Sequence, residues 1–108
     1  MSGVALIVDD SAVNRMLLVR HLASLGISAR EAVDGKSALE SLRAESTDVA
    51  VVLLDVMMPE MDGYEVLAAI KSDEALRHLP VIMISGIDEL DSVARCIELG
   101  ATDFLPKP

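Results

Sequence analysis

The chain has 108 residues, 52% of them hydrophobic, and a formal net charge of −9 at pH 7. This length is typical of a single domain, and the apolar fraction is sufficient for a hydrophobic core. The acidic charge argues against a surface that binds nucleic acid. No apolar run approaches the roughly 18 residues of a membrane span, and the N-terminus lacks the basic and apolar segments of a secretory signal.

The first half of the chain alternates between strand patterns and helix patterns. VALIV at 4–8 is a short apolar run, which is typical of a strand covered on both faces. Apolar residues then recur with helical spacing over 11–26, and Gly26 is a helix stop. Residues 27–33 alternate between apolar and polar and predict a strand at the sheet edge. Residues 34–45 predict a second helix.

The second half repeats this alternation. VAVVLL at 49–54 is the most hydrophobic strand pattern, so we expect it at the centre of the sheet. Residues 62–72 and 88–100 have the apolar spacing of helices, and 79–85 predicts a fourth strand. A fifth short strand is expected to begin within 101–108.

Several residues should start the helices or face the core. Asp34 is a candidate N-cap, and Asp62 with Glu65 has the spacing of a capping box. Cys96 is the one cysteine, so it cannot form an internal disulfide, which fits a reducing cytoplasm; we expect it to be a small buried hydrophobe. The side chains expected to face inward are Val13, Met16, Leu17, Leu22, Leu25, Ala38, Leu39, Leu42, Val66, Leu67, Ile70, Leu90, Val93, Ala94 and Ile97.

Strands that alternate with helices predict an α/β fold, with a parallel sheet, right-handed crossovers and helices on both faces. We expect one domain over 1–108, cut short after its fifth strand, because a fifth helix would normally cover the sheet beside the first. Three or four apolar side chains on such a helix would contribute roughly 1.5–3 kcal/mol each. Without it, one face of the sheet is partly uncovered, which suggests a larger parent protein or a covering partner chain.

Polar side chains follow four of the predicted strands. Asp9 and Asp10 follow the first, Asp55 follows the third, Ser85 ends the fourth, and Lys107 lies near the end of the fifth. In an open parallel sheet the carboxyl ends of the strands form one edge, and sites lie outside that edge. We therefore expect these five side chains to converge.

The chemistry of the five residues suggests phosphoryl transfer. Three carboxylates repel one another, and Mg²⁺ would relieve that repulsion because it prefers oxygen ligands. The hydroxyl of Ser85 and the ammonium of Lys107 suit a phosphoryl group bound beside the metal. Asp55 would then be the nucleophile that forms an aspartyl phosphate.

Four motifs resemble the receiver domain of two-component response regulators. They are IVDDS, LLDVMMPEMDGYE, PVIMISG and GATDFLPKP, and they occur in the family's order over essentially the whole chain. The resemblance implies a flavodoxin-like, doubly wound five-stranded sheet with the strand order 2-1-3-4-5, here without the fifth helix.

The resemblance also implies roles for the acidic residues and their loop. Asp55 would be the phosphoacceptor and a metal ligand. Asp10 would bind Mg²⁺ directly, and Asp9 would act mainly through water. Met57 would contribute its backbone carbonyl to the metal, so the identity of its side chain would matter little there.

Further implied roles concern the end of the chain. Ser85 would be the switch hydroxyl, and Lys107 would pair with the phosphoryl oxygens. Phe104 would be the switch aromatic, which rotates inward when Ser85 moves toward the phosphate. The peptide bond between Lys107 and Pro108 would be cis.

Some positions depart from the family pattern or fill in its variable places. Phe104 stands where a tyrosine is common, so it has no hydroxyl and must signal through packing. Met57 and Ile87 occupy two positions that commonly tune the lifetime of the phosphate, and neither can position a water molecule, so we expect a long-lived phosphoryl group. A homodimer is compatible with the family, but the absent fifth helix would leave its usual surface incomplete.

We interpret the chain as a phosphoacceptor switch of a two-component phosphorelay. The expected donor is a phosphohistidine on a histidine kinase or a histidine phosphotransfer protein. Phosphorylation would act through Ser85 and Phe104 on the surface of helix 88–100 and the last strand. The output would lie in a domain beyond residue 108 or in a separate effector. We expect a cytoplasmic location, no membrane contact, and no enzymatic activity beyond assistance to its own phosphorylation and dephosphorylation.

Two alternatives stay open. The first is a Mg²⁺-dependent phosphohydrolase with an aspartyl-phosphate intermediate. Such an enzyme needs a general acid near its nucleophile, whereas the residue two positions beyond Asp55 is Met57. The second is an interaction module that has kept the fold but is not phosphorylated. The complete set of acceptor residues counts against it.

Overall fold

The computed structural model describes residues 3–45, 48–85 and 90–106. Within this part of the chain, five strands and four helices alternate, which confirms the element order predicted from the sequence. The elements are β1 Val4–Val8, α1 Ala12–Ser24, β2 Ala29–Ala32, α2 Gly35–Glu45, β3 Val49–Asp55, α3 Gly63–Ser72, β4 Val81–Ser85, α4 Leu90–Glu98 and β5 Asp103–Pro106.

The five strands form one parallel sheet in the order β2-β1-β3-β4-β5, as the resemblance implied. The most hydrophobic strand, β3, is central, and the alternating strand, β2, is at an edge. Four consecutive residues of β1 and four of β3 are buried, because helices cover both faces of the sheet. Both sequence-based placements are therefore confirmed.

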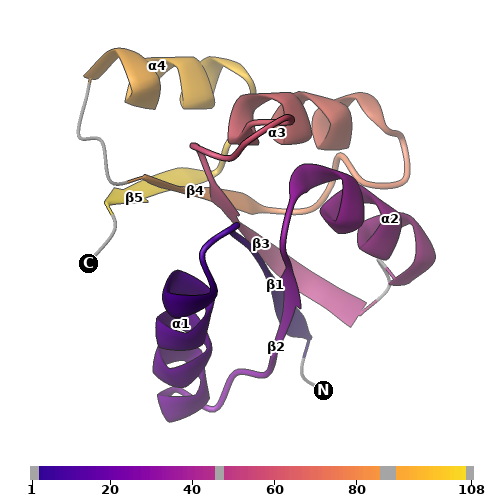
Figure 1. Ribbon diagram of the computed structural model, residues 1–108. Helices are drawn as coiled ribbons and strands as arrows, with labels where there is room; N and C mark the ends of the chain where they lie inside the picture. The colour runs from indigo at the N-terminus through magenta and orange to yellow at the C-terminus, as the bar shows by residue number, and fades with distance from the viewer. Residues whose placement is uncertain (1–2, 46–47, 86–89, 107–108) are drawn as a thin grey trace.

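Helices cover the two faces of the sheet unequally (Figure 1). The larger core lies between the sheet and α2, α3 and α4, and it includes Leu54, Leu42 and Leu67, all fully buried. The smaller core lies on the opposite face, where Leu18 and Leu22 of α1 pack against it. No helix in the described part of the chain is long and apolar enough to cross a membrane.

The predicted inward face of α1 was largely wrong. Leu18 and Val19 pack against the sheet together with Leu22, and only Leu22 was among the residues expected there. The other four residues expected to face inward are exposed, namely Val13 (60%), Met16 (47%), Leu17 (45%) and Leu25 (63%). Residues 16–19 are all apolar, so helical spacing alone does not select which side of this helix meets the sheet.

The predicted inward face of α4 was also partly wrong. Ile97 is 60% exposed and Ala94 is exposed, although both were expected to face inward. Cys96 is completely buried in the larger core, as predicted for a small hydrophobe. Burial raises the pKa of its thiol, so the side chain stays neutral at physiological pH.

The helix boundaries follow the predicted signals. Asp62 accepts a hydrogen bond from the backbone N–H of Glu65, and the Glu65 side chain accepts one in return from the backbone of Asp62, which completes the capping box. Asp34 accepts a hydrogen bond from the N–H of Ser37 at 2.8 Å, so it caps α2. Gly26 ends α1 with a φ of 79°, a conformation that favours glycine.

Candidate functional site

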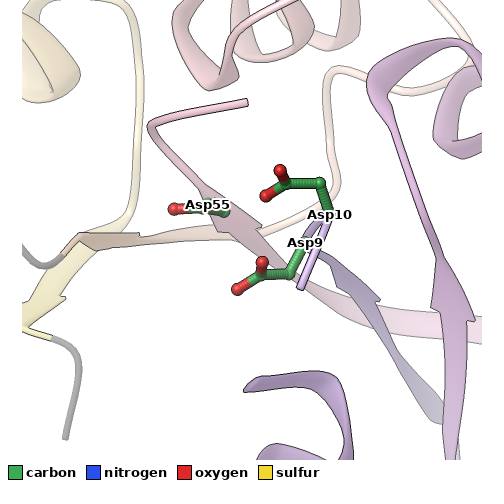
Figure 2. Close-up of side chains that lie close together, drawn as sticks. All are labelled: Asp9, Asp10 and Asp55. Atoms are coloured by element: carbon green, nitrogen blue, oxygen red, sulfur yellow. The ribbon is translucent and has the colours of Figure 1, made fainter. Parts of the chain in front are cut away.

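Three carboxylates meet at the carboxyl edge of the sheet. Asp9 and Asp10 follow β1, and Asp55 is the last residue of the neighbouring strand β3. One oxygen from each side chain can be chosen so that all three lie within 4.8 Å of one another, and Figure 2 shows the three side chains side by side. The parallel pairing of β1 and β3 brings these residues together, because both strands end at the same edge.

The cluster concentrates negative charge in a partly buried place. Asp9 and Asp55 are each only 2% exposed, whereas Asp10 is exposed. Two unit charges at this separation repel by about 3.5 kcal/mol at an effective dielectric constant of about 20. Mg²⁺ prefers oxygen ligands and commonly keeps several waters when few carboxylates bind it, so the donor atoms and their spacing fit such an ion.

The loop after Asp55 is held close to the sheet. The backbone N–H of Met57 donates to Oδ1 of Asp55 at 3.3 Å, and the N–H of Val56 donates to the carbonyl of Ile84 at 3.1 Å. The N–H of Gly63 donates to the Val56 carbonyl at 2.9 Å. The loop therefore returns to the strand end, while the Met57 side chain is 59% exposed and its backbone stays near the carboxylates.

The end of β1 is held by residues that sequence reasoning missed. The backbone N–H of Ser11 donates to Oδ1 of Asp9 at 2.8 Å, and Nη1 of Arg15 donates to the Asp9 carbonyl at 2.7 Å. Arg15 also pairs with Glu31 of β2, the one strand to which the sequence assigned none of the five site residues. The sequence did offer one signal for Arg15, since it is a basic residue one turn into a helix that begins beside the acidic residues.

Of the other predicted site residues, some lie in the part of the chain that the structure describes and some lie outside it. Ser85 is the last residue of β4 and is 1% exposed, so it lies at the same sheet edge as Asp55. Phe104 lies on β5 opposite Met83 and packs against the larger core. Lys107, its peptide bond to Pro108, and Ile87 lie outside the described residues, so their predicted roles stay predictions.

The fold and the site at its carboxyl edge define an α/β domain with an acidic pocket. The family model described as "Response regulator receiver domain" matches residues 5–108. The chain therefore belongs to the response regulator receiver domain family. Receiver domains are signalling domains, and the acidic pocket formed by Asp9, Asp10 and Asp55 fits a phosphoacceptor switch.

Individual relatives support the same assignment. The response regulator PleD of Caulobacter vibrioides is 40% identical over all of this chain, which spans 23% of the length of PleD. The N-terminal domain of a receiver protein from Methanoculleus marisnigri is 36% identical, with a TM-score of 0.88 over 97% of this chain and 84% of that one. A chain from the CheX–CheY–BeF₃–Mg²⁺ complex of Borrelia burgdorferi is 33% identical, with a TM-score of 0.91 over 98% of this chain and 78% of that one.

Proposed function

We propose that this receiver domain is a phosphoacceptor switch in which Asp55 accepts a phosphoryl group from a phosphohistidine, with Mg²⁺ as cofactor. The observation that carries the proposal is the approach of Asp9, Asp10 and Asp55 to within 4.8 Å at the carboxyl edge of the sheet. Such a cluster is costly without a cation or a positively charged partner, because like charges in a partly buried site repel.

The residues that would hold the ion are Asp10 and Asp55 directly, Asp9 mainly through water, and the backbone carbonyl of Met57. When bound, Mg²⁺ would supply positive charge to the carboxylates and to the oxygens of the phosphoryl group. The spacing of the carboxylate oxygens supports this assignment. The BeF₃ and Mg²⁺ in the structure of the Borrelia complex support it by analogy.

The transfer itself would use one carboxylate oxygen of Asp55 as the nucleophile. That oxygen forms a bond to phosphorus while the bond between phosphorus and the donor's imidazole nitrogen breaks. The imidazole keeps the electron pair of the broken bond and afterwards takes a proton from solvent. The hydroxyl of Ser85 would donate a hydrogen bond to a phosphoryl oxygen, and Lys107 would neutralise another.

The change at Asp55 would reach the surface through Ser85 and Phe104. Ser85 is buried at the end of β4, and Phe104 is half-buried on the adjacent strand β5. Phe104 packs against the same core that contains Cys96 of α4. A shift of Ser85 toward the phosphoryl group would open space for the Phe104 ring to turn inward, which would favour one of two arrangements of α4 and β5.

The donor would be a histidine kinase or a histidine phosphotransfer protein, and the output would lie in a domain beyond residue 108 or in a separate effector. PleD is much longer than the stretch that this chain matches, which is compatible with an attached output domain. We propose a cytoplasmic location, where the buried thiol of Cys96 would stay reduced. The domain would assist only its own phosphorylation and dephosphorylation.

The test is to incubate the purified protein with Mg²⁺ and a phosphohistidine donor, and to locate the added phosphoryl group by mass spectrometry. We expect one phosphoryl group on Asp55, and none in an Asp55→Asn variant or in the presence of EDTA. Glu40→Gln is the matched control, because it removes an exposed carboxylate from α2, away from the site. It should be phosphorylated like the wild type.

Two results would favour the alternatives. Continuous turnover of a small phosphate ester would favour a phosphohydrolase. Complete absence of phosphorylation, together with no Mg²⁺-dependent binding of beryllofluoride, would favour an interaction module that only keeps the fold. Phosphorylation of the Asp55→Asn variant to the wild-type extent would contradict the assignment of the acceptor.

A further inference from the structure

Arg15 connects α1 to the ends of two strands. Its Nη1 donates to the backbone carbonyl of Asp9 at 2.7 Å, and its Nε lies 3.1 Å from Oε1 of Glu31 on β2. The Arg15 side chain is only 13% exposed, whereas that of Glu31 is 48% exposed. A guanidinium with two separate partners and little exposure is held in one orientation, unlike a solvated surface arginine.

The contact with Asp9 falls on an atom that governs the geometry of the site. The Asp9 carbonyl belongs to the planar peptide unit that joins Asp9 to Asp10, so its direction also orients the backbone of Asp10. Asp9 is fixed at two further atoms, since its N–H donates to Ala32 at 3.2 Å and its Oδ1 accepts from Ser11 at 2.8 Å. Neither of these two bonds acts on the peptide unit that leads to Asp10.

This arrangement matters most when no cation is bound. The carboxylates of Asp9, Asp10 and Asp55 then repel one another, and Asp10 is the exposed member that can turn away into solvent. We propose that Arg15 is a positioning residue for the divalent-cation site, which holds the Asp9–Asp10 peptide in the orientation that directs Asp10 toward Asp55. This inference rests on the proposed function, because it assigns Arg15 to the same Mg²⁺ site.

A positioning role and a purely electrostatic role of Arg15 predict opposite changes in Mg²⁺ affinity when the residue is replaced. Arg15 is a cation near the site, so its removal would strengthen the binding of Mg²⁺ if only its charge mattered. If its hydrogen bond to Asp9 holds the site in shape, its removal must weaken the binding. Residues that orient metal ligands typically change metal affinity by about 10–100-fold when they are replaced.

The experiment is a calorimetric titration with Mg²⁺ of the wild type and three variants. Arg15→Met keeps an unbranched apolar stem but removes both contacts, and we expect its Kd for Mg²⁺ to rise about tenfold. Arg15→Lys keeps one donor and should recover part of the affinity. Arg20→Met is the matched control, since Arg20 is an exposed arginine on the same helix; its affinity should be unchanged.

Phosphorylation kinetics separate positioning from folding. For Arg15→Met, the Mg²⁺ concentration that gives half-maximal phosphorylation should rise, while the rate at saturating Mg²⁺ stays close to that of the wild type. If the substitution only impaired folding, the variant would show a lower maximal rate of phosphorylation and a weaker circular dichroism signal. The Kd of its folded fraction for Mg²⁺ would not change. That result would overturn the inference.

The remaining outcomes are also decisive. Unchanged or tighter Mg²⁺ binding by folded Arg15→Met, with normal phosphorylation of Asp55, would overturn the role of Arg15 and leave the proposed function intact. If the wild type itself failed to bind Mg²⁺, that result would contradict the proposed function, and the inference about Arg15 would be contradicted with it. An equal loss of affinity in Arg20→Met would show that the effect does not come from the contacts of Arg15, and it would also overturn the inference.

Discussion

The first residue of α3 packs directly against the end of β3: a Cβ atom at Gly63 would lie 2.2 Å from the carbonyl oxygen of Asp55. The same atom would lie 2.8 Å from Cα of Val56, so the obstacle is backbone and not a flexible side chain. Gly63 also donates a hydrogen bond to the Val56 carbonyl at 2.9 Å. The absence of a side chain at Gly63 therefore lets α3 close the loop that contains Met57.

Gly63→Ala should disturb this loop. The methyl group must push α3 away from the strand end, and such overpacking typically costs about 1–3 kcal/mol. Displacement of the loop would also move the Met57 carbonyl, so we expect weaker Mg²⁺ binding in addition to a lower free energy of unfolding. Urea denaturation and a Mg²⁺ titration measure the two effects. Ser72→Ala, at the far end of α3, is the control, and equal behaviour of the two variants would contradict this account.

The order of the elements along the chain was predictable because three of the strands are compact apolar runs with clear boundaries, whereas the strand order in the sheet was implied by the resemblance to receiver domains. Val49–Asp55 shows this best, since seven residues with one polar end can hardly be read as a helix. The face of α1 was not predictable in the same way. Met16, Leu17, Leu18 and Val19 are all apolar, and only the position of the helix over the sheet decides that the last two are covered.

The acidic part of the site was predictable for a geometric reason. Parallel strands that are neighbours end at one edge, so Asp9, Asp10 and Asp55 had to meet once β1 and β3 were adjacent. The contribution of Arg15 was not predictable, because its contact with Glu31 joins residues that are 16 positions apart. Spacing along one helix carries no information about a side chain that reaches across to a second strand.

Asp10→Asn should stabilise the metal-free protein. The substitution removes one of three mutually repelling carboxylates, and because Asp10 is exposed we expect a gain of about 1 kcal/mol in the free energy of unfolding. Added salt should reduce this gain, since screening weakens the repulsion. Urea denaturation in EDTA, at two salt concentrations, measures it, and Glu40→Gln controls for the general loss of negative charge.

The order of stabilities should reverse when Mg²⁺ is present. An ion at 100 times its Kd stabilises the folded state by about 2.7 kcal/mol, and Asp10→Asn should lose most of this effect if Asp10 is a direct ligand, as proposed. The wild type should therefore have the higher free energy of unfolding in Mg²⁺, and the Asp10→Asn variant should have the higher one in EDTA. Equal stabilisation of both proteins by Mg²⁺ would mean that Asp10 is not a ligand.

The phosphoryl group on Asp55 should be long-lived. Met57 is two residues beyond Asp55, the proposed acceptor, and its side chain is 59% exposed, but a thioether cannot orient water for attack on phosphorus. We expect the wild type to keep its phosphoryl group for minutes or longer after the donor is removed. Met57→Asn introduces an amide that can hold a water molecule, so it should shorten the lifetime.

The decay of phosphorylated protein, followed by mass spectrometry, measures this lifetime. Met57→Leu is the control, because it changes the shape of the side chain without adding a hydrogen-bonding group, and its lifetime should match that of the wild type. Loss of the phosphoryl group within seconds in the wild type would sink the prediction. So would identical decay in Met57→Asn.

The cap of α2 should make the stability of the domain depend on pH. Asp34 accepts a hydrogen bond from the backbone N–H of Ser37 at 2.8 Å, and this bond is the largest reason why its pKa lies below the usual value of 3.8. A second contribution comes from hydrogen bonding with the Ser37 side chain, and burial opposes both. Since the pKa is lower in the folded than in the unfolded chain, the stabilisation is complete above the unfolded value and is lost as the pH falls through the folded one.

Asp34→Asn isolates this effect, because asparagine is an equally good N-cap but does not titrate. The other carboxylates are the same in both proteins, so the difference between their free energies of unfolding reports on Asp34 alone. Relative to the variant, the wild type should hold a constant stability from neutral pH down to about pH 4, and should lose stability below it. Urea denaturation at a series of pH values measures the difference. Two curves that stay parallel from pH 7 into the acid range would show that the cap is not coupled to the charge of Asp34.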